Sequence, residues 1–277
     1  MIQDPEEMRQ QIFIAHHKSP PIDLPSSLGS VVQKALRTSD SSVSQEGFDL
    51  FTNKSHFHVE TDAWSDVAVL MEALDSPLHP QRIGLMHYRR FLAANLSPTK
   101  LKRVYVQPDA ASKILESLVE ASDDRPRTVF VPKPLRIKSL EEQFLRFHPE
   151  YGDLFLKVAK IFIRNLERSL GVVIVRPLRS HFFTPWNMFH GPREFATRYS
   201  GLIKETFLEA DLGSYVAPMD SKDQRWAGFI CERLFSIYVE TIELHGLWPV
   251  ERVPMATTQA RGLEQVLGSG LELLRLR

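Results

Sequence analysis

Short apolar runs alternate along this chain with longer segments of helical periodicity, and this alternation constrains the fold more than any other feature. Four runs carry the β-branched and aromatic residues that favour buried strands. They are Gln11–Ala15, Ile83–Phe91, Thr128–Val131 and Val172–Val175. Because strands that alternate with helices build a sheet covered by helices, we predict an α/β fold with a central parallel or mixed sheet.

The segments between these runs predict amphipathic helices, with apolar residues every three or four positions. We expect helices over Asp62–Leu74, Asp109–Glu120, Pro149–Leu170, Pro192–Ala210 and Asp223–His245. Ser139 and Glu142 match a capping box that opens a further helix, and Gly171 is placed to cap the helix before it. The stretch Ser26–Phe51 has weak periodicity and predicts a long loop with at most one short helix.

Composition excludes several classes of protein. The 277 residues include 34 Lys and Arg against 34 Asp and Glu, so the formal net charge is zero and a nucleic-acid partner is not expected. The single cysteine, Cys231, permits no intrachain disulfide and favours a reducing, cytoplasmic location. Residues 1–11 lack a signal-peptide pattern, and no apolar run approaches the roughly 20 residues of a membrane helix.

We expect a single domain over residues 1–252, because no segment is long and polar enough to act as a linker. Residues 253–277 form a C-terminal tail whose leucines and Val266 have the spacing of an amphipathic helix. Two interpretations of the tail remain open. It docks on the parent domain, or it makes a subunit contact or a peripheral contact with the inner face of a membrane.

The run that begins at Ile83 ends in four polar-capable side chains, His87-Tyr88-Arg89-Arg90. Ligands of open α/β sheets bind outside the carboxyl ends of strands. Two arginines there suit a diphosphate, because each guanidinium offers forked donors to anionic oxygens. An edge strand whose arginines pair with surface carboxylates fits the same residues equally well.

The segment around Glu232 predicts a helix that is apolar nearly all round and therefore buried. Arg225 and Glu232 share one side of this helix at about 100° per residue. A buried carboxylate must be paired, or its pKa rises. Glu232 is thus either a structural partner of Arg225 or a catalytic carboxylate. Asp66, which follows Asp62 at helical spacing, is expected in solvent or at a helix cap.

Two further segments carry candidate binding residues. His17 and Lys18 follow the first strand, where a cation would receive an anionic ligand. Trp186 and Asn187 lie in an aromatic segment expected to be a loop leading into a strand, and an aromatic ring beside an amide suits sugar or base stacking. Polar strand ends and buried aromatic side chains are also common in proteins without a site there.

Several motifs are missing from the sequence. No phosphate-binding P-loop, dinucleotide-binding GxGxxG or GxSxG elbow occurs, and there is no Asp-x-Asp pair. His56 and His58 alone make a weak argument for zinc. The residues therefore assign no certain cofactor, and a divalent metal (Mn or Mg) stays open without a motif to hold it.

The order of the motifs resembles a bacterial family of capsular and exopolysaccharide biosynthesis, a former domain of unknown function similar to GT-A-type glycosyltransferases. The matching segments are His17-Lys18, Ile83–Leu92, Asn187-Met188-Phe189 and Gly228–Leu234, and they span most of the chain. The resemblance implies a GT-A-like Rossmann-type fold with a central mixed sheet flanked by helices. It also implies transfer from a nucleotide-sugar donor, most often a UDP-sugar, to a polysaccharide or lipid-linked glycan acceptor.

Under this resemblance, each candidate residue receives a role. His17, Lys18, Arg90 and Arg225 would bind the donor diphosphate, and Trp186 and Asn187 the acceptor or a sugar. Glu232, His87 and Arg89 would be catalytic, with Glu232 as the base for the acceptor hydroxyl. Cations at the position of the relatives' Asp-x-Asp suggest leaving-group stabilisation without a metal.

Two other functions fit the same residues. Ser26–Phe51 lacks a match to the family's donor loop, which allows a catalytically inactive protein of this fold that binds glycans or nucleotides. A phosphoryl-transfer or nuclease-like enzyme would use His87, the arginines and Glu232, but it lacks clustered carboxylates for metal.

Overall fold

The computed structural model describes residues 10–16, 31–35, 49–50, 66–75, 79–87, 89–96, 102–106, 110–211 and 226–258. Its α-helices are α2 (Asp66–Asp75), α3 (Ala111–Asp124), α4 (Leu140–Phe147), α5 (Gly152–Leu170), α6 (Arg193–Glu209) and α7 (Trp226–Leu244). The 3-10 helices within the described residues are η2 (Ala94–Leu96), η4 (Pro149–Tyr151) and η5 (Pro177–Arg179). None of the described helices is long and apolar enough to cross a membrane.

The strands form one large mixed sheet and a small ribbon. The large sheet contains β1 (Gln10–His16), β2 (Val31–Ala35), β3 (Asp49–Leu50), β4 (Arg82–His87), β5 (Arg90–Leu92), β6 (Arg103–Tyr105), β7 (Val129–Pro132), β10 (Phe189–Pro192), β11 (Val250–Val253) and β12 (Met255–Thr257). The ribbon pairs β8 (Leu135–Arg136) with β9 (Phe182–Phe183). The main path runs β11-β7-β10-β4-β1-β2-β3, with β10 antiparallel to both neighbours. The predicted α/β fold with a mixed central sheet is confirmed.

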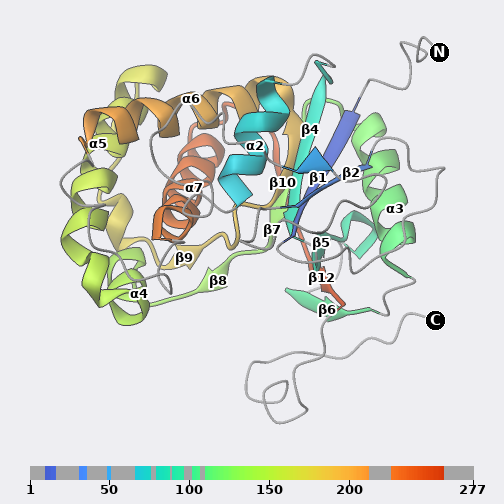
Figure 1. The fold of residues 1–277 in the computed structure, drawn as a ribbon, viewed down its shortest axis with the longest axis horizontal. Coiled ribbons are helices and arrows are strands. Elements are labelled where there is room, and N and C mark those ends of the chain that lie inside the picture. Colours follow the sequence, from blue (N-terminus) through green and yellow to red (C-terminus); the bar gives the residue numbers. More distant parts are fainter. Residues whose placement is uncertain are drawn as a thin grey trace.

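Helices cover both faces of the sheet, with α3 on one side and α2, α6 and α7 on the other (Figure 1). Alternating side chains of a strand point to opposite faces. In β1, Ile12 and Ile14 accordingly join the α3 core, whereas Phe13 and Ala15 join the core under the other helices. Both cores are buried, so the central strands are apolar throughout rather than alternating with polar residues.

The chain order reverses between β1 and β4. From β1 the sheet continues on one side through β2 and β3, and on the other through β4, which is parallel to β1. The carboxyl ends of β1 and β4 therefore lie together at a topological switch point, where ligands of open α/β sheets bind.

The segment from Ile83 to Phe91 is not one strand. β4 ends at His87, and β5 returns antiparallel to it with Arg90 opposite His87. β5 also pairs with β12, and this contact with the far end of the chain explains the reversal. The prediction of a single strand over Ile83–Phe91 was therefore wrong, and His87 at the end of β4 is buried.

Two other expectations fail. The stretch predicted as a long loop contains β2 and β3, which continue the sheet from β1 because backbone pairing outweighs their weak side-chain pattern. Val172–Val175 is not a strand, and Val173 and Val175 are 77% and 80% exposed.

Both predicted helix signals are confirmed. Ser139 caps α4 by accepting a hydrogen bond from the Glu142 N–H, and Gly171 ends α5 in the left-handed region at φ 67°. At the far end of the chain, β11 crosses the boundary that we placed after residue 252, and β12 continues the sheet to Thr257. Residues 259–277, which hold most of the expected tail, lie outside the described residues.

Candidate functional site at the switch point

The strand registers bring three separate segments to the carboxyl end of β4. Ala15 of β1 pairs with His87 at the end of β4. On the other side of β4, Phe189 of β10 pairs with Leu85 and runs in the opposite direction. The residues just before β10, Trp186 and Asn187, therefore reach the same edge of the sheet as His87 and the end of β1.

A buried pair joins β4 to the helix above it. The Nε2 atom of His87 lies 3.1 Å from Oδ1 of Asp66, in the first turn of α2, and both side chains are at most 8% exposed. A carboxylate that accepts from Nε2 fixes the orientation of the imidazole ring. Asp66 is thus a buried partner of His87, contrary to the expectation of a residue in solvent.

Trp186 gathers two guanidinium groups at this edge. The Cζ atoms of Arg90 and Arg103 lie 4.4 and 4.8 Å from the centre of its ring, within the range of cation–π contacts. Arg90 starts β5 and Arg103 starts β6, and both strands pair with β12. The small β5-β12-β6 extension therefore positions positive charge beside an aromatic ring.

The backbone at this point has a rare conformation. Trp186 and Asn187 are consecutive non-glycine residues in the left-handed region, with φ 64° and 50°. Each such residue costs on the order of 1 kcal/mol and persists when surrounding contacts impose it. One of these contacts is the buried hydroxyl of Tyr199, which lies 3.2 Å from the side-chain oxygen of Asn187.

Tyr199 also connects Asn187 to helix α7. Its hydroxyl donates to the carbonyl oxygen of Cys231 at 3.0 Å, so one proton is shared between two acceptors. Burial raises the pKa of Tyr199 well above its ordinary value, and the charge of Glu232 acts in the same direction, so the hydroxyl stays a neutral donor. This contact brings Asn187 next to the turn of α7 that carries Glu232.

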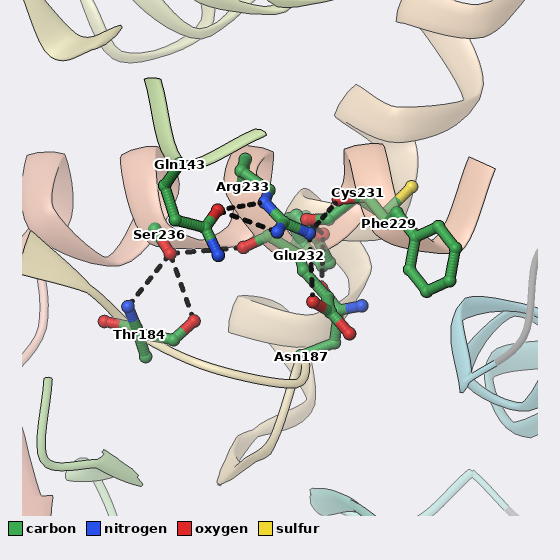
Figure 2. Close-up of polar contacts among 9 residues, drawn as sticks. Gln143, Thr184, Asn187, Phe229, Cys231, Glu232, Arg233 and Ser236 are labelled. Carbon is green, nitrogen blue, oxygen red and sulfur yellow. Dashed lines mark hydrogen bonds and ion pairs between the residues drawn. The ribbon is translucent and has the colours of Figure 1, made fainter. Parts of the chain in front are cut away.

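Glu232 belongs to a buried polar cluster (Figure 2). Its Oε2 accepts from Nη1 of Arg233 at 3.2 Å, and the Glu232 side chain remains 14% exposed. Arg233 is 3% exposed and also donates to the side-chain oxygen of Gln143, at 2.9 and 2.7 Å, and to the carbonyl of Phe229 at 2.8 Å. Burial lowers the pKa of Arg233, while Glu232 raises it. Arg233 thus holds the Oε2 atom of Glu232, while the Glu232 side chain stays partly accessible from outside the protein.

The single cysteine is a structural neighbour of this cluster. Cys231 is fully buried, and burial raises the pKa of its thiol well above the ordinary value. The negative charges of Glu232 and Asp66 raise it further. Cys231 therefore packs in the large core and is not a reactive nucleophile.

The predicted site residues divide into two groups. His87, Arg90, Trp186, Asn187 and Glu232 lie around the switch point, linked by the contacts given above. Arg89 follows β4 and is half-buried, and its carbonyl accepts from the N–H of Thr258 at 3.1 Å. The expected positions of His17, Lys18 and Arg225 lie outside the described residues.

Four residues of this arrangement were not predicted from the sequence: Arg103, Gln143, Tyr199 and Arg233. The burial of Arg233 could have been predicted, because a second charge beside Glu232 in a helix that is apolar nearly all round must also be buried and paired. The partner of Arg233 lies 90 residues earlier in the chain, at a spacing that no local pattern reveals.

The described residues offer no ready metal site. Among them, no group of three or more His, Cys, Asp or Glu side chains is arranged to hold a metal ion. The Asp66 carboxylate faces His87, and Glu232 faces Arg233, so both carboxylates near the switch point already have a cationic or imidazole partner.

A separate surface hollow lies elsewhere. It has a volume of about 600 Å³ and is lined by Ser169, Arg193, Glu194, Thr197 and Arg198 of α5 and α6. Arg193 follows the last residue of β10, whereas Trp186 precedes the first, so the hollow belongs to the opposite edge of the sheet. It is not part of the arrangement at the switch point.

Comparisons with known proteins agree with this architecture. The sequence model of a domain of unknown function (DUF4422) matches residues 78–243, well over half of the chain. No curated protein matches the sequence. Among solved structures, the apo form of WbbM, a bifunctional glycosyltransferase, is similar with a TM-score of 0.70 and 15% identity. The similarity covers 91% of this chain but only 45% of the WbbM chain, and at this identity it shows a shared fold.

Proposed function

Because the chain belongs to the DUF4422 family and has the fold of a glycosyltransferase, we propose that it transfers a sugar from a nucleotide-sugar donor, a UDP-sugar in the first instance, to a polysaccharide or lipid-linked glycan acceptor. One observation carries the proposal: cationic, aromatic and carboxylate side chains converge at the switch point beside the end of β4. In open α/β sheets this is where nucleotides bind.

The arginines supply the electrostatic part of the proposed reaction. The bond between the anomeric carbon and the diphosphate breaks, and negative charge develops on the leaving phosphate oxygen. Arg89, Arg90 and Arg103 are half-buried, and guanidinium groups in a partly dry site stabilise such charge more than they would in water. Trp186, in contact with two of them, offers a flat surface for the base or a sugar.

Glu232 supplies the base. The acceptor hydroxyl gives its proton to the Glu232 carboxylate, the hydroxyl oxygen bonds to the anomeric carbon, and the nucleoside diphosphate leaves. Arg233 and Gln143 act as positioning residues: Arg233 donates to one carboxylate oxygen of Glu232, and the Gln143 oxygen accepts from Arg233 and holds its guanidinium in place. His87, oriented by Asp66, lies at the same strand end as a hydrogen-bond donor or acceptor for the donor sugar.

Nucleotide binding is tested by isothermal titration of UDP into the full chain, with and without EDTA. We expect binding in both conditions, and a Trp186→Ala variant that binds UDP about tenfold more weakly, since stacking on an aromatic ring contributes about 1–3 kcal/mol. UDP binding that requires manganese would show that cations alone do not hold the diphosphate. A thermal-shift screen of nucleotide sugars then identifies the donor, because a ligand of the folded state raises the unfolding midpoint.

Turnover is tested with Glu232→Gln. This variant should lose at least about a hundredfold in transfer rate and retain UDP affinity, because it removes the base and keeps the shape of the side chain. The matched control is Glu240→Gln, the same change two turns later on α7, which should transfer at the normal rate. Transfer by Glu232→Gln at the normal rate would remove Glu232 from the mechanism. UDP binding without any transfer or UDP-sugar hydrolysis would instead favour the inactive binding protein.

A further inference from the structure

Exposed apolar side chains are concentrated at one end of the molecule, away from the sheet. The described residues expose seven large hydrophobic side chains, and four of them lie around α4 and the segment between α5 and β9. These are Phe147, Val173, Val175 and Phe182, which are 61%, 77%, 80% and 52% exposed. Scattered exposed apolar residues need no explanation, but a cluster of them marks an interaction surface.

The elements that carry these residues are in direct contact. In the β8–β9 ribbon Arg136 lies opposite Phe182, and the backbone N–H of Ile137 donates to the carbonyl of His181. Helix α4, which ends at Phe147, packs against η5, which follows Val175 closely in the chain. Figure 1 shows α4, β8 and β9 together at this end of the molecule. The four apolar side chains therefore belong to one continuous region.

This region is strongly basic, although the whole chain is neutral. Residues 133–148 and 172–182 contain six Lys and Arg residues and two glutamates, an excess of four positive charges in a chain with none overall. Arg136, Arg146, Arg176 and Arg179 are exposed, and among the described residues no carboxylate forms an ion pair with them. We call the four apolar side chains and these four arginines the basic apolar face.

The inward residues of the same segment explain why the valines remain outside. Ile174 and Leu178 pack against the large core, and the N–H of Ile174 donates to the Glu167 carboxylate at 2.8 Å. Val173, Val175, Arg176 and Arg179 alternate with them and point outward. The segment is thus held to the protein by one side, while its other side presents apolar and cationic groups together.

We propose that the basic apolar face binds the surface of a membrane that contains anionic phospholipids. Apolar side chains flanked by Lys and Arg enter the boundary between headgroups and acyl chains, while the cations remain among the phosphates. Each cation near an anionic leaflet adds to the attraction, so an excess of four is substantial. Single valines on an irregular segment suit a lipid surface, which needs no groove of matching shape.

The face is connected to the candidate site. β9 is followed within three residues by Trp186, and Arg233 lies 5.1 Å from the ring of Phe183 in β9 and 5.3 Å from that of Phe144 in α4. A membrane at the face would thus lie near Glu232. That this placement presents a lipid-linked acceptor to Glu232 rests on the proposed function, but membrane binding itself does not.

The test is co-sedimentation of the full chain with vesicles. Vesicles of phosphatidylcholine and phosphatidylglycerol in equal parts should bind the protein, and phosphatidylcholine alone should bind it much less. Binding should decrease when salt is raised, because the Debye length shortens from about 10 Å at 0.1 M to about 3 Å at 1 M. Equal binding to both kinds of vesicle, or no binding, would overturn the proposal; an acidic protein partner would then be the remaining occupant of the face.

Paired variants locate the contact. Val173→Ser with Val175→Ser, and Arg176→Glu with Arg179→Glu, should each lower binding to the anionic vesicles by about tenfold or more. The controls change exposed residues elsewhere: Leu208→Ser with Leu244→Ser, and Lys113→Glu with Lys160→Glu. If the controls lower binding as much as the face variants do, or the face variants bind normally, the surface lies elsewhere, for example in residues 259–277.

Two additional measurements keep the outcomes separate. The face variants should keep the normal unfolding midpoint, because all four side chains are exposed, so a loss of vesicle binding is not a loss of folding. They should also bind UDP normally. Face variants that lose vesicle binding but bind UDP normally would support the membrane proposal. If the parent protein binds vesicles but not UDP, only the proposed transferase activity is contradicted.

Discussion

The Nε2 atom of His87 lies 3.1 Å from Oδ1 of Asp66, and this pair joins the end of β4 to the start of α2. The two residues are 21 positions apart, and His87 ends β4, one of the two strands that meet at the topological switch point. The pair therefore fixes the helix above the site relative to the strand that delivers Arg89 and Arg90. Its energetic contribution can be measured directly.

Asp66→Ala should lower the free energy of unfolding by about 3 kcal/mol, because it removes one partner of a buried pair and leaves the other without compensation. Asp66→Asn should cost only about 1 kcal/mol, since the amide oxygen still accepts a hydrogen bond. Urea unfolding measures both. Asp75→Asn, at the exposed end of the same helix, is the control and should change stability by less than about 0.5 kcal/mol. An Asp66→Ala protein as stable as this control would contradict a buried pair.

Arg233 should be one of the most sensitive positions in the chain. Arg233→Met should lower the free energy of unfolding by at least about 3 kcal/mol, because it removes a buried charge that donates to the Gln143 oxygen and to the Glu232 carboxylate. Arg233→Lys keeps the charge but cannot reproduce the forked contact, so an intermediate loss is expected. Arg198→Met removes a half-exposed partner of Glu194 on α6 and should cost less than about 1 kcal/mol. Chemical denaturation compares the three variants, and equal losses for Arg233→Met and Arg198→Met would exclude a special role for the buried cluster.

The left-handed backbone at Asn187 makes a different prediction. Asn187→Ala should destabilise the protein by about 2 kcal/mol, because alanine tolerates positive φ poorly and the contact with Tyr199 is lost. Asn187→Gly loses the same contact but relieves the backbone, so it should be about 1 kcal/mol more stable than the alanine variant. Thermal and urea unfolding give the order. A glycine variant less stable than the alanine variant would show that backbone conformation is not what selects asparagine here.

The elements that local patterns define were predictable. Gln11–Ala15 and Thr128–Val131 are apolar, β-branched runs between turn residues, and both are strands of the central sheet. The caps at Ser139 and Gly171 depend on side-chain and backbone chemistry within a few residues, and both formed as expected. The apolar helix around Glu232 was likewise evident, since its buried character follows from its own composition.

What failed depends on contacts far apart in the chain. The chain reverses between His87 and Arg90 because β5 pairs with β12 near residue 256. No glycine or proline lies at this turn, so the local sequence carried no sign of it. Val172–Val175 has the composition of a strand, but none of the described strands pairs with it, and two of its valines face outward. In the candidate site, the partners of Trp186 and Arg233 come from β5, β6 and α4, so local spacing could nominate the residues but not assemble them.

The buried His190 predicts how stability depends on pH. Its Nε2 donates to the Gln10 side-chain oxygen at 3.0 Å, and its Nδ1 faces Gly84, where an added Cβ would lie 2.7 Å away. Burial, assisted by the charge of Arg82, lowers the pKa of His190 from 6.5 to about 3, so the folded protein keeps the ring neutral while the unfolded chain takes up a proton below pH 6.5. The free energy of unfolding is therefore unaffected by protonation of His190 above pH 6.5. As pH falls from 6.5 toward 3, it decreases by about 1.4 kcal/mol per pH unit, because only the unfolded chain binds the proton.

The corresponding experiment compares variants at two pH values. Between pH 7 and pH 4.5 the parent protein should lose about 3 kcal/mol more than His190→Gln, which fills a similar space and does not titrate there. The comparison between variants removes the contribution of every other titrating group, and urea unfolding at each pH supplies the free energies. His245→Gln, at an exposed histidine beyond α7, should keep the full pH dependence of the parent. If His190→Gln retains that dependence as well, the acid sensitivity arises from other groups, and His190 is not the neutral histidine that its burial requires.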